Sequence, residues 1–246
     1  MRNVWIIARR EYKLFFISPV AYIVAFFFMI LLGYFFYSAL RDAIIQATYQ
    51  AYAPTVQIVI SPLVTLLLFV MPAITMRSIS EELRMGTMEL LLTAPVKDWE
   101  LVVGKWLGAF LFMLSLLAVT WIFPIVLNFL VDPGIDQGIL IASYLGLVLM
   151  VSSLVAIGVF ISSLFNNQLV VFLVSLAIVL IFWLVRPAST SAGGLGNQIL
   201  TYLNFIDHYL NFFNGTIDLS DVVYYISMTS LALFLGTVSV EVRRWH

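Results

Sequence analysis

The chain has 246 residues, of which 63% are hydrophobic, 15% are aromatic and only 10% are charged, with a formal net charge of −1. A soluble domain carries about 25% charged residues, so this chain has too few polar side chains to cover a surface in water. Together with a mean hydropathy of +1.06, the composition excludes a soluble enzyme, a disordered tail and a basic nucleic-acid-binding domain, and it predicts an integral membrane protein.

Residues 1–17 predict an amphipathic helix on the cytoplasmic surface of the membrane. Four apolar side chains share one helical face: Trp5, Ala8, Tyr12 and Phe15. The basic side chains lie away from that face: Arg2, Arg9, Arg10 and Lys13. Ser18-Pro19 separates this helix from the apolar run that follows, because a residue before proline is disfavoured in a helix. A positively charged anchor with no further role is the alternative interpretation.

Long uncharged runs predict six membrane-spanning helices, because one crossing needs about 20 apolar residues. The predicted spans are residues 18–40, 57–76, 106–130, 139–164, 169–186 and 222–240. The uncharged stretch from 137 to 185 is more than twice as long as one crossing needs, so it is divided at Asn166-Asn167-Gln168. The runs are continuous, not alternating, which favours helices over a β-barrel. The predicted fold class is therefore an all-α integral membrane protein with a single membrane domain over residues 1–246.

The positions of lysine and arginine predict that both termini lie in the cytoplasm. Six spans put both termini on one side, and that side holds ten basic residues: Arg2, Arg9, Arg10, Lys13, Arg77, Arg84, Lys97, Lys105, Arg243 and Arg244. The opposite side holds only Arg41 and Arg186. Because basic residues concentrate in short cytoplasmic loops, this distribution predicts that both termini are cytoplasmic. We expect a multi-pass protein of a bacterial-type inner membrane.

Residues 77–105 form the largest predicted cytoplasmic loop. Ser78-Ile79-Ser80-Glu81 fits a capping box that opens a short helix, and Gly86-Thr87 can interrupt or re-cap it. Met88 and a leucine run follow, and Pro95 ends the segment. A short helix at the membrane surface with an apolar run has apolar area to offer to a partner. A hairpin that packs on the ends of its own spans is the alternative.

Residues 197–214 predict an amphipathic helix on the outer side, too polar to cross the membrane. Five apolar side chains recur at spacings of four, three, four and three: Ile199, Leu203, Ile206, Leu210 and Phe213. Such a stripe must contact lipid, its own spans or a second protomer. We expect it to pack on the outer ends of the last two spans.

Several kinds of chemistry are absent from the sequence. It contains no phosphate-binding loop, so the chain is not expected to hydrolyse ATP, and we expect no catalytic site, no metal and no directly bound cofactor. No cysteine is present to form a disulfide or a thiolate site. The predicted spans carry no ionisable residue away from their ends, which disfavours a proton- or ion-coupled secondary carrier. A carrier that uses only neutral ligands remains open, as does a non-transporting membrane scaffold.

The loop resembles the segment between spans two and three of type-2 ABC export permeases. The likeness runs from Ser80-Glu81-Glu82-Leu83-Arg84-Met85-Gly86-Thr87 through Met88-Glu89-Leu90-Leu91-Leu92-Thr93-Ala94-Pro95-Val96. The following Asp98-Trp99-Glu100-Leu101-Val102-Val103-Gly104-Lys105 is also similar to that family. So are Ser143-Tyr144-Leu145-Gly146 and the stretch from Ala156-Ile157-Gly158 to Asn167-Gln168. Nearly the whole chain is covered, and the gliding-motility-associated permeases are the most similar group.

The resemblance implies a six-span permease subunit of an exporter, which pairs with a second, identical or homologous protomer. It also implies two copies of an ABC ATPase subunit that bind the ATP, and no nucleic-acid partner. Some members of the group work with an auxiliary membrane protein, which is a further expected partner in the lipid bilayer. In the family, a coupling helix in the loop contacts the ATPase. The residues that correspond here are Glu81, Glu82, Arg84, Gly86, Thr87, Met88 and Glu89. The outer helix matches the re-entrant helices that cap the path in such exporters, which implies an external lid.

Overall fold

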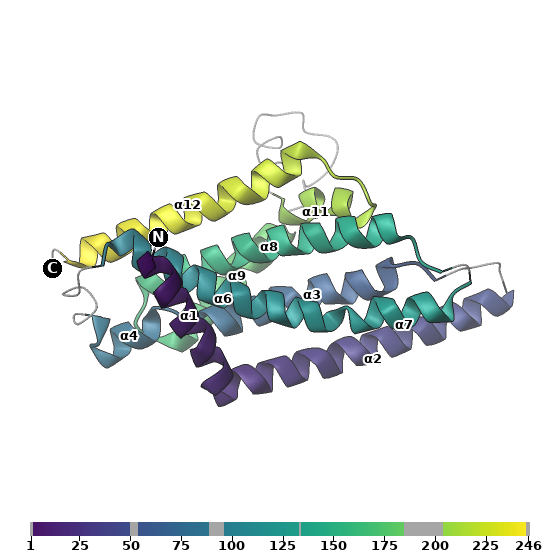
Figure 1. Cartoon of the computed structure of the whole chain (residues 1–246), viewed down its shortest axis with the longest axis horizontal. Helices are drawn as coiled ribbons and strands as arrows, with labels where there is room; N and C mark the ends of the chain where they lie inside the picture. Colours follow the sequence, from purple (N-terminus) through teal and green to yellow (C-terminus); the bar gives the residue numbers. More distant parts are fainter. Residues whose placement is uncertain (1, 50–53, 89–95, 133, 185–203, 245–246) are drawn as a thin grey trace.

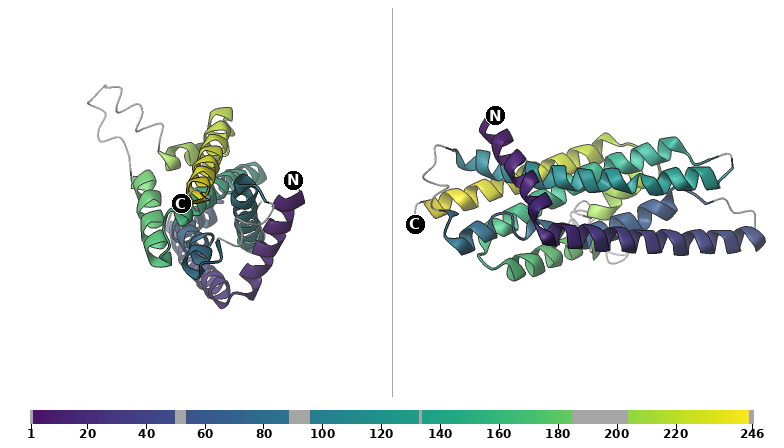
Figure 2. Two further views of the ribbon diagram at one scale, coloured as in Figure 1. Left: turned by 90° about the vertical axis from the view of Figure 1, so that its left-hand side faces the viewer. Right: turned by 60° about the horizontal axis from the view of Figure 1, so that its bottom comes forward.

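The computed structural model describes residues 2–49, 54–88, 96–132, 134–184 and 204–244, and every regular element in these ranges is an α-helix. The first five helices are α1 (Arg2–Ile17), α2 (Pro19–Tyr49), α3 (Gln57–Thr75), α4 (Ser80–Met85) and α6 (Asp98–Thr120). The others are α7 (Ile122–Leu130), α8 (Gln137–Leu164), α9 (Gln168–Leu184), α11 (Phe205–Phe213) and α12 (Leu219–Arg244). The long helices run side by side in an elongated bundle, and α1 lies across one end of it (Figures 1 and 2).

Five of these helical segments are long and apolar enough to cross a membrane. They are Pro19–Gln46, Gln57–Met85, Asp98–Leu130, Gln137–Leu164 and Leu219–Arg243. The predicted span 169–186 corresponds to α9, a shorter apolar helix whose described part ends at Leu184; residues 185 and 186 lie outside the described residues. The all-α prediction is therefore confirmed, and five of the predicted spans have a counterpart of full length.

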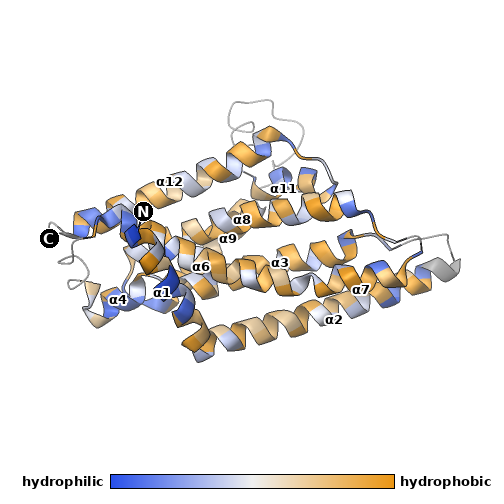
Figure 3. Cartoon of the chain, in the orientation of Figure 1, coloured by the Kyte–Doolittle hydropathy of each residue, from blue (hydrophilic) through white to orange (hydrophobic). Residues whose placement is uncertain are grey.

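Hydrophilic residues gather at one end of the bundle, whereas apolar residues dominate the lengths of the helices (Figure 3). That end holds α1, α4 and the last turns of α12, and both termini lie there (Figure 1). We call it the terminal end. Helix α11 and the turn between α7 and α8 lie toward the opposite end.

Helix α8 occupies the centre of the bundle and packs against α3, α6, α9, α11 and α12. Small side chains allow these close approaches, as they do at helix contacts in membranes generally. A Cβ atom added at Gly158 would overlap the side chain of Thr75 on α3, and one added at Gly146 would lie 2.6 Å from Phe212 on α11. Both glycines therefore set the distance between α8 and a neighbouring helix.

The predicted span 106–130 differs from the structure at its start and in its middle. Helix α6 begins at Asp98, so residues 98–105 of the predicted cytoplasmic loop are helical. Its first turn carries Asp98 and Glu100, which suit the positive end of a helix dipole, and Glu100 Oε2 accepts a hydrogen bond from the Lys97 amide at 3.1 Å. The helix is interrupted at Trp121, between α6 and α7. Pro124 has no N–H to donate to the Thr120 carbonyl, which explains an interruption at this point.

Helix α1 forms as predicted, but it packs on α6 and is more than a surface anchor. Ala8 is fully buried, whereas Trp5 is 56% exposed. The buried face of α1 is therefore rotated relative to the predicted apolar face, and Trp5 lies outside the contact with α6. Gly104 and Gly108 on α6 make this contact possible. A Cβ added at Gly104 would lie 2.7 Å from Ile7, and one added at Gly108 would lie 2.9 Å from the Ala8 carbonyl. The two glycines, one helical turn apart, form a flat surface on which α1 rests.

We expect Gly108→Leu to separate α1 from α6, because no side chain fits between Gly108 and the α1 backbone. Once separated, α1 opens more often and its Arg9–Arg10 site is cleaved faster. Limited trypsin digestion of the purified protein, followed by mass spectrometry, measures the rate. Gly33→Leu on α2 is the control, since the nearest atom to an added Cβ is 3.9 Å away. Equal cleavage rates in both variants and the wild type would contradict this packing.

Candidate functional site

Helix α4 begins where α8 supplies a cap. The predicted capping box at Ser78 is wrong: the helix starts after Ile79, which gives no side-chain cap. Instead, Ser162 Oγ of α8 accepts hydrogen bonds from the amides of Ile79, at 2.9 Å, and Ser80, at 3.0 Å. Ser80 Oγ in turn donates to the Met76 carbonyl at the end of α3. The start of α4 is thus held by two of the long helices.

Gly86 ends α4 in the left-handed backbone region, with φ of 68°. The Thr87 amide donates to the Glu82 carbonyl at 3.1 Å, and the Gly86 amide donates to the Leu83 carbonyl at 3.4 Å. This is a Schellman motif, in which glycine avoids the cost that a Cβ has in the left-handed region. An added Cβ at Gly86 would meet no atom within 4 Å. The need for glycine is therefore conformational and not a matter of space within this chain.

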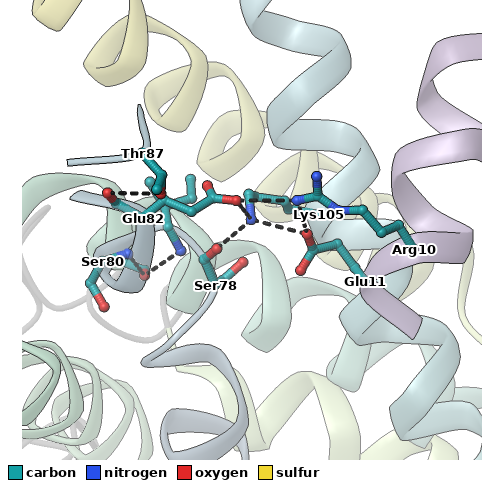
Figure 4. Close-up of polar contacts among 9 residues, drawn as sticks. Arg10, Glu11, Ser78, Ser80, Glu82, Thr87 and Lys105 are labelled. Atoms are coloured by element: carbon teal, nitrogen blue, oxygen red, sulfur yellow. Dashed lines mark hydrogen bonds and ion pairs between the residues drawn. The ribbon is translucent and has the colours of Figure 1, made fainter. Parts of the chain in front are cut away.

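A buried ionic cluster connects α4 to α6 and α1 (Figure 4). Lys105 of α6 is its centre, with a side chain only 2% exposed. Its ammonium group lies 2.9 Å from Glu82 Oε1 and 3.2 Å from Glu11 Oε1, and it donates to the Ser78 carbonyl at 2.6 Å. Arg10 of α1 contacts the same two carboxylates, at 3.0 Å from Glu11 and 3.3 Å from Glu82. Two cations thus balance two anions, which is what allows Lys105 and the two carboxylates to be buried, while the Arg10 side chain is 52% exposed at the edge of the cluster.

The predicted contact residues of the loop fall into distinct environments. Glu82 belongs to the ionic cluster and its side chain is 12% exposed. Met88 is 4% exposed and packs in the core, so it is not available at the surface. Arg84 and Gly86 are exposed, while Glu81 and Thr87 are half-buried. Glu89 lies outside the described residues.

Sequence reasoning missed three members of the cluster: Arg10, Glu11 and Lys105. The sequence places Lys105 among the basic residues of the cytoplasmic side and Arg10 on the basic face of the first helix, and neither position indicates an ion pair. One signal was present, namely Glu11, a single acid between basic residues on a helix otherwise suited to a membrane surface. An acid in that setting needs a cation, and the structure shows two.

A groove of about 450 Å³ runs between α1 and α4. Its lining includes Ile17 of α1 and Glu81 and Met85 of α4. Ile17 is 72% exposed and Met85 is 57% exposed, so apolar side chains face outward beside the ionic cluster. This groove, which we call the α1–α4 groove, offers apolar area with a charged edge formed by Glu11, Glu81 and Arg77.

Helix α11 differs in length and register from the predicted outer helix 197–214. It starts at Phe205, because Asn204 has an extended backbone and caps the helix by accepting from the amides of Ile206, at 3.0 Å, and Asp207, at 3.4 Å. The buried residues of α11 are Phe205, Ile206, Tyr209 and Phe212. Of the predicted stripe, Ile206 is 9% exposed, Phe213 packs partly on the core, and Leu210 is 39% exposed. Ile199 and Leu203 lie outside the described residues.

Helix α11 packs mainly on α8, whereas the prediction placed it on the last two spans. Ser143 Oγ donates to the Phe212 carbonyl at 3.2 Å, and Tyr209 donates to the Ser143 carbonyl at 3.3 Å. Contacts to the last spans are also present. Tyr225 of α12 donates to the Phe205 carbonyl at 2.8 Å, and Asp221 accepts from Asn211 at 2.8 Å.

A second polar cluster fastens α11 to the start of α12. His208 Nδ1 lies 2.6 Å from Asp221 Oδ1, and the His208 ring stacks on Tyr224 at a centroid distance of 3.9 Å. Asp221 is almost fully buried and receives hydrogen bonds on both oxygens from α11. Among the described residues, no three histidine, aspartate or glutamate side chains group closely enough to hold a metal ion.

We expect Lys105→Met to destabilise the protein by about 3 kcal/mol, because it leaves two buried carboxylates without their central cation. Equilibrium unfolding in mixed detergent micelles measures the change. Lys13→Met removes an exposed lysine of α1 and serves as the control. Adding Glu82→Gln to Lys105→Met should recover part of the loss. A Lys105 variant as stable as the control would show that the cluster contributes no stability.

We expect Gly146→Leu to lift α11 from α8, whereas Leu210→Asp should leave it in place. The chain has no native cysteine, so a single Ser143→Cys reporter beneath α11 gives a clean signal. Ser143 is 1% exposed, so a water-soluble maleimide should label the reporter slowly in the parent and in Leu210→Asp, and quickly in Gly146→Leu. Fast labelling in Leu210→Asp would favour the register predicted from the aliphatic spacing.

A comparison with curated proteins gives no match. A family model described as ABC-2 family transporter protein matches residues 5–242, which include both polar clusters and nearly all of the helical residues. The match spans nearly the whole chain, so the protein belongs to the ABC-2 family of transporter proteins.

Proposed function

We propose that this chain is the permease subunit of an ATP-binding-cassette exporter, most similar to the gliding-motility-associated group. It crosses the inner membrane six times, with α9 as the fifth span and both termini in the cytoplasm. The family membership and the apolar helices support this proposal. The concentration of hydrophilic residues at the terminal end agrees with a cytoplasmic face there (Figure 3).

The chain works with an ABC ATPase subunit in two copies, which binds the ATP, and with a second permease protomer, identical or homologous. An auxiliary membrane protein completes some complexes of this kind. The ATPase docks on α4 and on the α1–α4 groove, at Glu81, Arg84, Gly86 and Thr87 of the predicted contact set, and Glu89 stays a predicted contact outside the described residues. Met85 provides the apolar contact, since it is the most exposed large apolar side chain of α4.

One observation carries this assignment: α4 is exposed on one side and fixed to three other helices on the other. The ionic cluster joins it to α6 and α1, and Ser162 joins it to α8. A force applied to α4 by a docked protein therefore reaches two long helices through short, buried, charged or hydrogen-bonded contacts. A surface loop without such contacts would bend without moving the spans.

The outer helix α11 acts as an external lid of the translocation path. Its fit over Gly146 and its polar attachment to Asp221 give it a defined closed position. Opening would require α11 to leave α8, or α8 and α12 to move apart. The residues that govern closure are then Tyr209 and Phe212, together with Ile206 and Phe213 from the predicted stripe.

Co-purification tests the proposal. The tagged chain, extracted from its native membrane, should bring down a protein with the sequence motifs of an ABC ATPase and with ATPase activity. We expect Met85→Asp to abolish this association, because a charge in a buried apolar contact opposes binding, with a loss of about 2 kcal/mol or more.

Val242→Asp is the matched control, since Val242 is 52% exposed at the terminal end and lies on α12, outside α4 and the α1–α4 groove. Both variants should keep the unfolding midpoint of the wild type. A chain that binds no ATPase at all would favour a secondary carrier or a scaffold. Equal ATPase recovery with Met85→Asp and Val242→Asp would place the docking surface elsewhere.

A further inference from the structure

A second groove at the terminal end lies on the opposite side of α4 from the ionic cluster. It has a volume of about 700 Å³ and is open to the outside. The end of α3, helix α4 and the turn between α8 and α9 surround it, and Ala73, Met76, Arg84, Gln168, Leu169 and Phe172 are among its lining residues. We call it the α4–α9 groove.

The polar part of the α4–α9 groove is suited to an anion. Arg84 is exposed and forms no ion pair with another described residue, unlike Arg10 in the ionic cluster. Gln168 Nε2 is buried beneath the groove surface and has no hydrogen-bond partner in the described part of the chain, so rotation of this side chain would bring an unused donor to a ligand in the groove. A buried amide donor without a partner costs free energy, which a bound acceptor would recover. Gln168 is also the first residue of α9, so the positive end of that helix dipole lies at the same place.

No described residue that lines the groove is acidic. No negative side chain in the lining therefore weakens the attraction of an anion to Arg84 and to the positive end of the α9 dipole. Two asparagines of the α8–α9 turn, Asn166 and Asn167, form the remaining polar edge. Asn167 Oδ1 accepts from the Leu169 amide at 2.9 Å, which fixes the first turn of α9. Arg243 approaches the turn from α12 and donates to the Leu164 carbonyl at 2.8 Å, which adds positive charge beside the groove.

The rest of the groove is apolar. Ala73 and Met76 belong to the last turns of α3 and the residue after it, and Leu169 and Phe172 to the first turns of α9. Leu169 is 65% exposed, and Leu173, one turn further along α9, is 53% exposed. The apolar floor therefore continues onto the outward face of an apolar helix. A small soluble anion gains no free energy from contact with these apolar side chains, whereas an acyl chain does.

We propose that the α4–α9 groove binds an anionic phospholipid. The phosphate accepts hydrogen bonds from Arg84 and from the Gln168 amide, and an acyl chain lies along Leu169 and Phe172. Basic pockets between membrane helices on the cytoplasmic side are known to suit anionic headgroups. A bidentate guanidinium is well matched to a phosphate, so Arg84 provides most of the selectivity.

This inference takes Arg84 out of the ATPase contacts and gives it a separate partner. A lipid held between Arg84 on α4 and Gln168 on α9 would connect α4 to α9, which the ionic cluster does not reach. The position of α4 would then depend on the lipid composition of the membrane. The inference does not need the ATPase, so it can be tested on the permease chain alone.

The experiment measures lipid binding by the purified full chain in detergent. Phosphatidylglycerol, phosphatidylcholine and inorganic phosphate are titrated separately, and bound molecules are counted by native mass spectrometry. We expect the wild type to prefer phosphatidylglycerol. Arg84→Gln should weaken phosphatidylglycerol binding by about tenfold, and Gln168→Met should weaken it by a smaller factor. Arg84→Lys should keep part of the preference, because it retains the charge but loses the bidentate geometry.

Arg9→Gln is the control, because it removes the same charge from an exposed position of α1 outside the groove. It should bind phosphatidylglycerol like the wild type. Equal binding of the two lipids by the wild type would overturn the proposal, as would Arg84→Gln and Arg9→Gln behaving alike. Arg84-dependent binding of inorganic phosphate without a lipid preference would identify a soluble-phosphate site and would also overturn it. Unfolding midpoints measured without added lipid show whether each variant is folded.

Discussion

A lysine that is 2% exposed cannot keep its charge unless negative groups surround it, and in this protein those groups come from two other helices. Lys105 is therefore more than a stabilising contact: it requires Glu82 of α4 and Glu11 of α1 to be present at one point. Helices α1, α4 and α6 must therefore come together when the protein folds, because otherwise a buried charge stays uncompensated. Arg10 completes the set, because a single cation would leave one carboxylate in excess.

Close packing provides the second constraint. The hydrocarbon of the bilayer is as apolar as leucine, so helices in a membrane gain little from burying large apolar side chains against each other. Glycines placed at crossing points, such as Gly104 and Gly108 beneath α1 and Gly146 beneath α11, bring backbones close enough for dispersion and hydrogen bonds to act. The polar contacts of both candidate regions lie beside these glycines. The geometry of the sites thus depends on residues that have no side chain.

The sequence predicts the elements well and their contacts less well, for physical reasons. Apolar runs identify the helices because lipid permits few alternatives. The register of α11 is ambiguous, since Phe205, Tyr209 and Phe212 recur at the same spacing as Ile206, Leu210 and Phe213. Only the surface of α8 decides between them. The burial of Lys105 could not be predicted either, because a lysine at the end of an apolar run usually marks an interface. Gly86-Thr87 was predicted as an interruption of the loop helix, and α4 does end there, in a Schellman motif that depends only on local backbone contacts.

The interruption between α6 and α7 divides the third span into two parts with different neighbours. The first part, α6, carries Lys105 and contacts α1 and α4. In the second part, α7, the Phe123 ring packs on Phe36 of α2 at a centroid distance of 5.3 Å. At the junction, Thr120 Oγ1 lies 3.0 Å from the Tyr144 hydroxyl of α8, which holds this point to the centre of the bundle. When a helix is interrupted at a point that is held in place, one part can tilt about that point without the other part sliding along its axis. A displacement at the terminal end would then reach α7 as a change of tilt about Thr120, and the contact of Phe123 with Phe36 on α2 need not break.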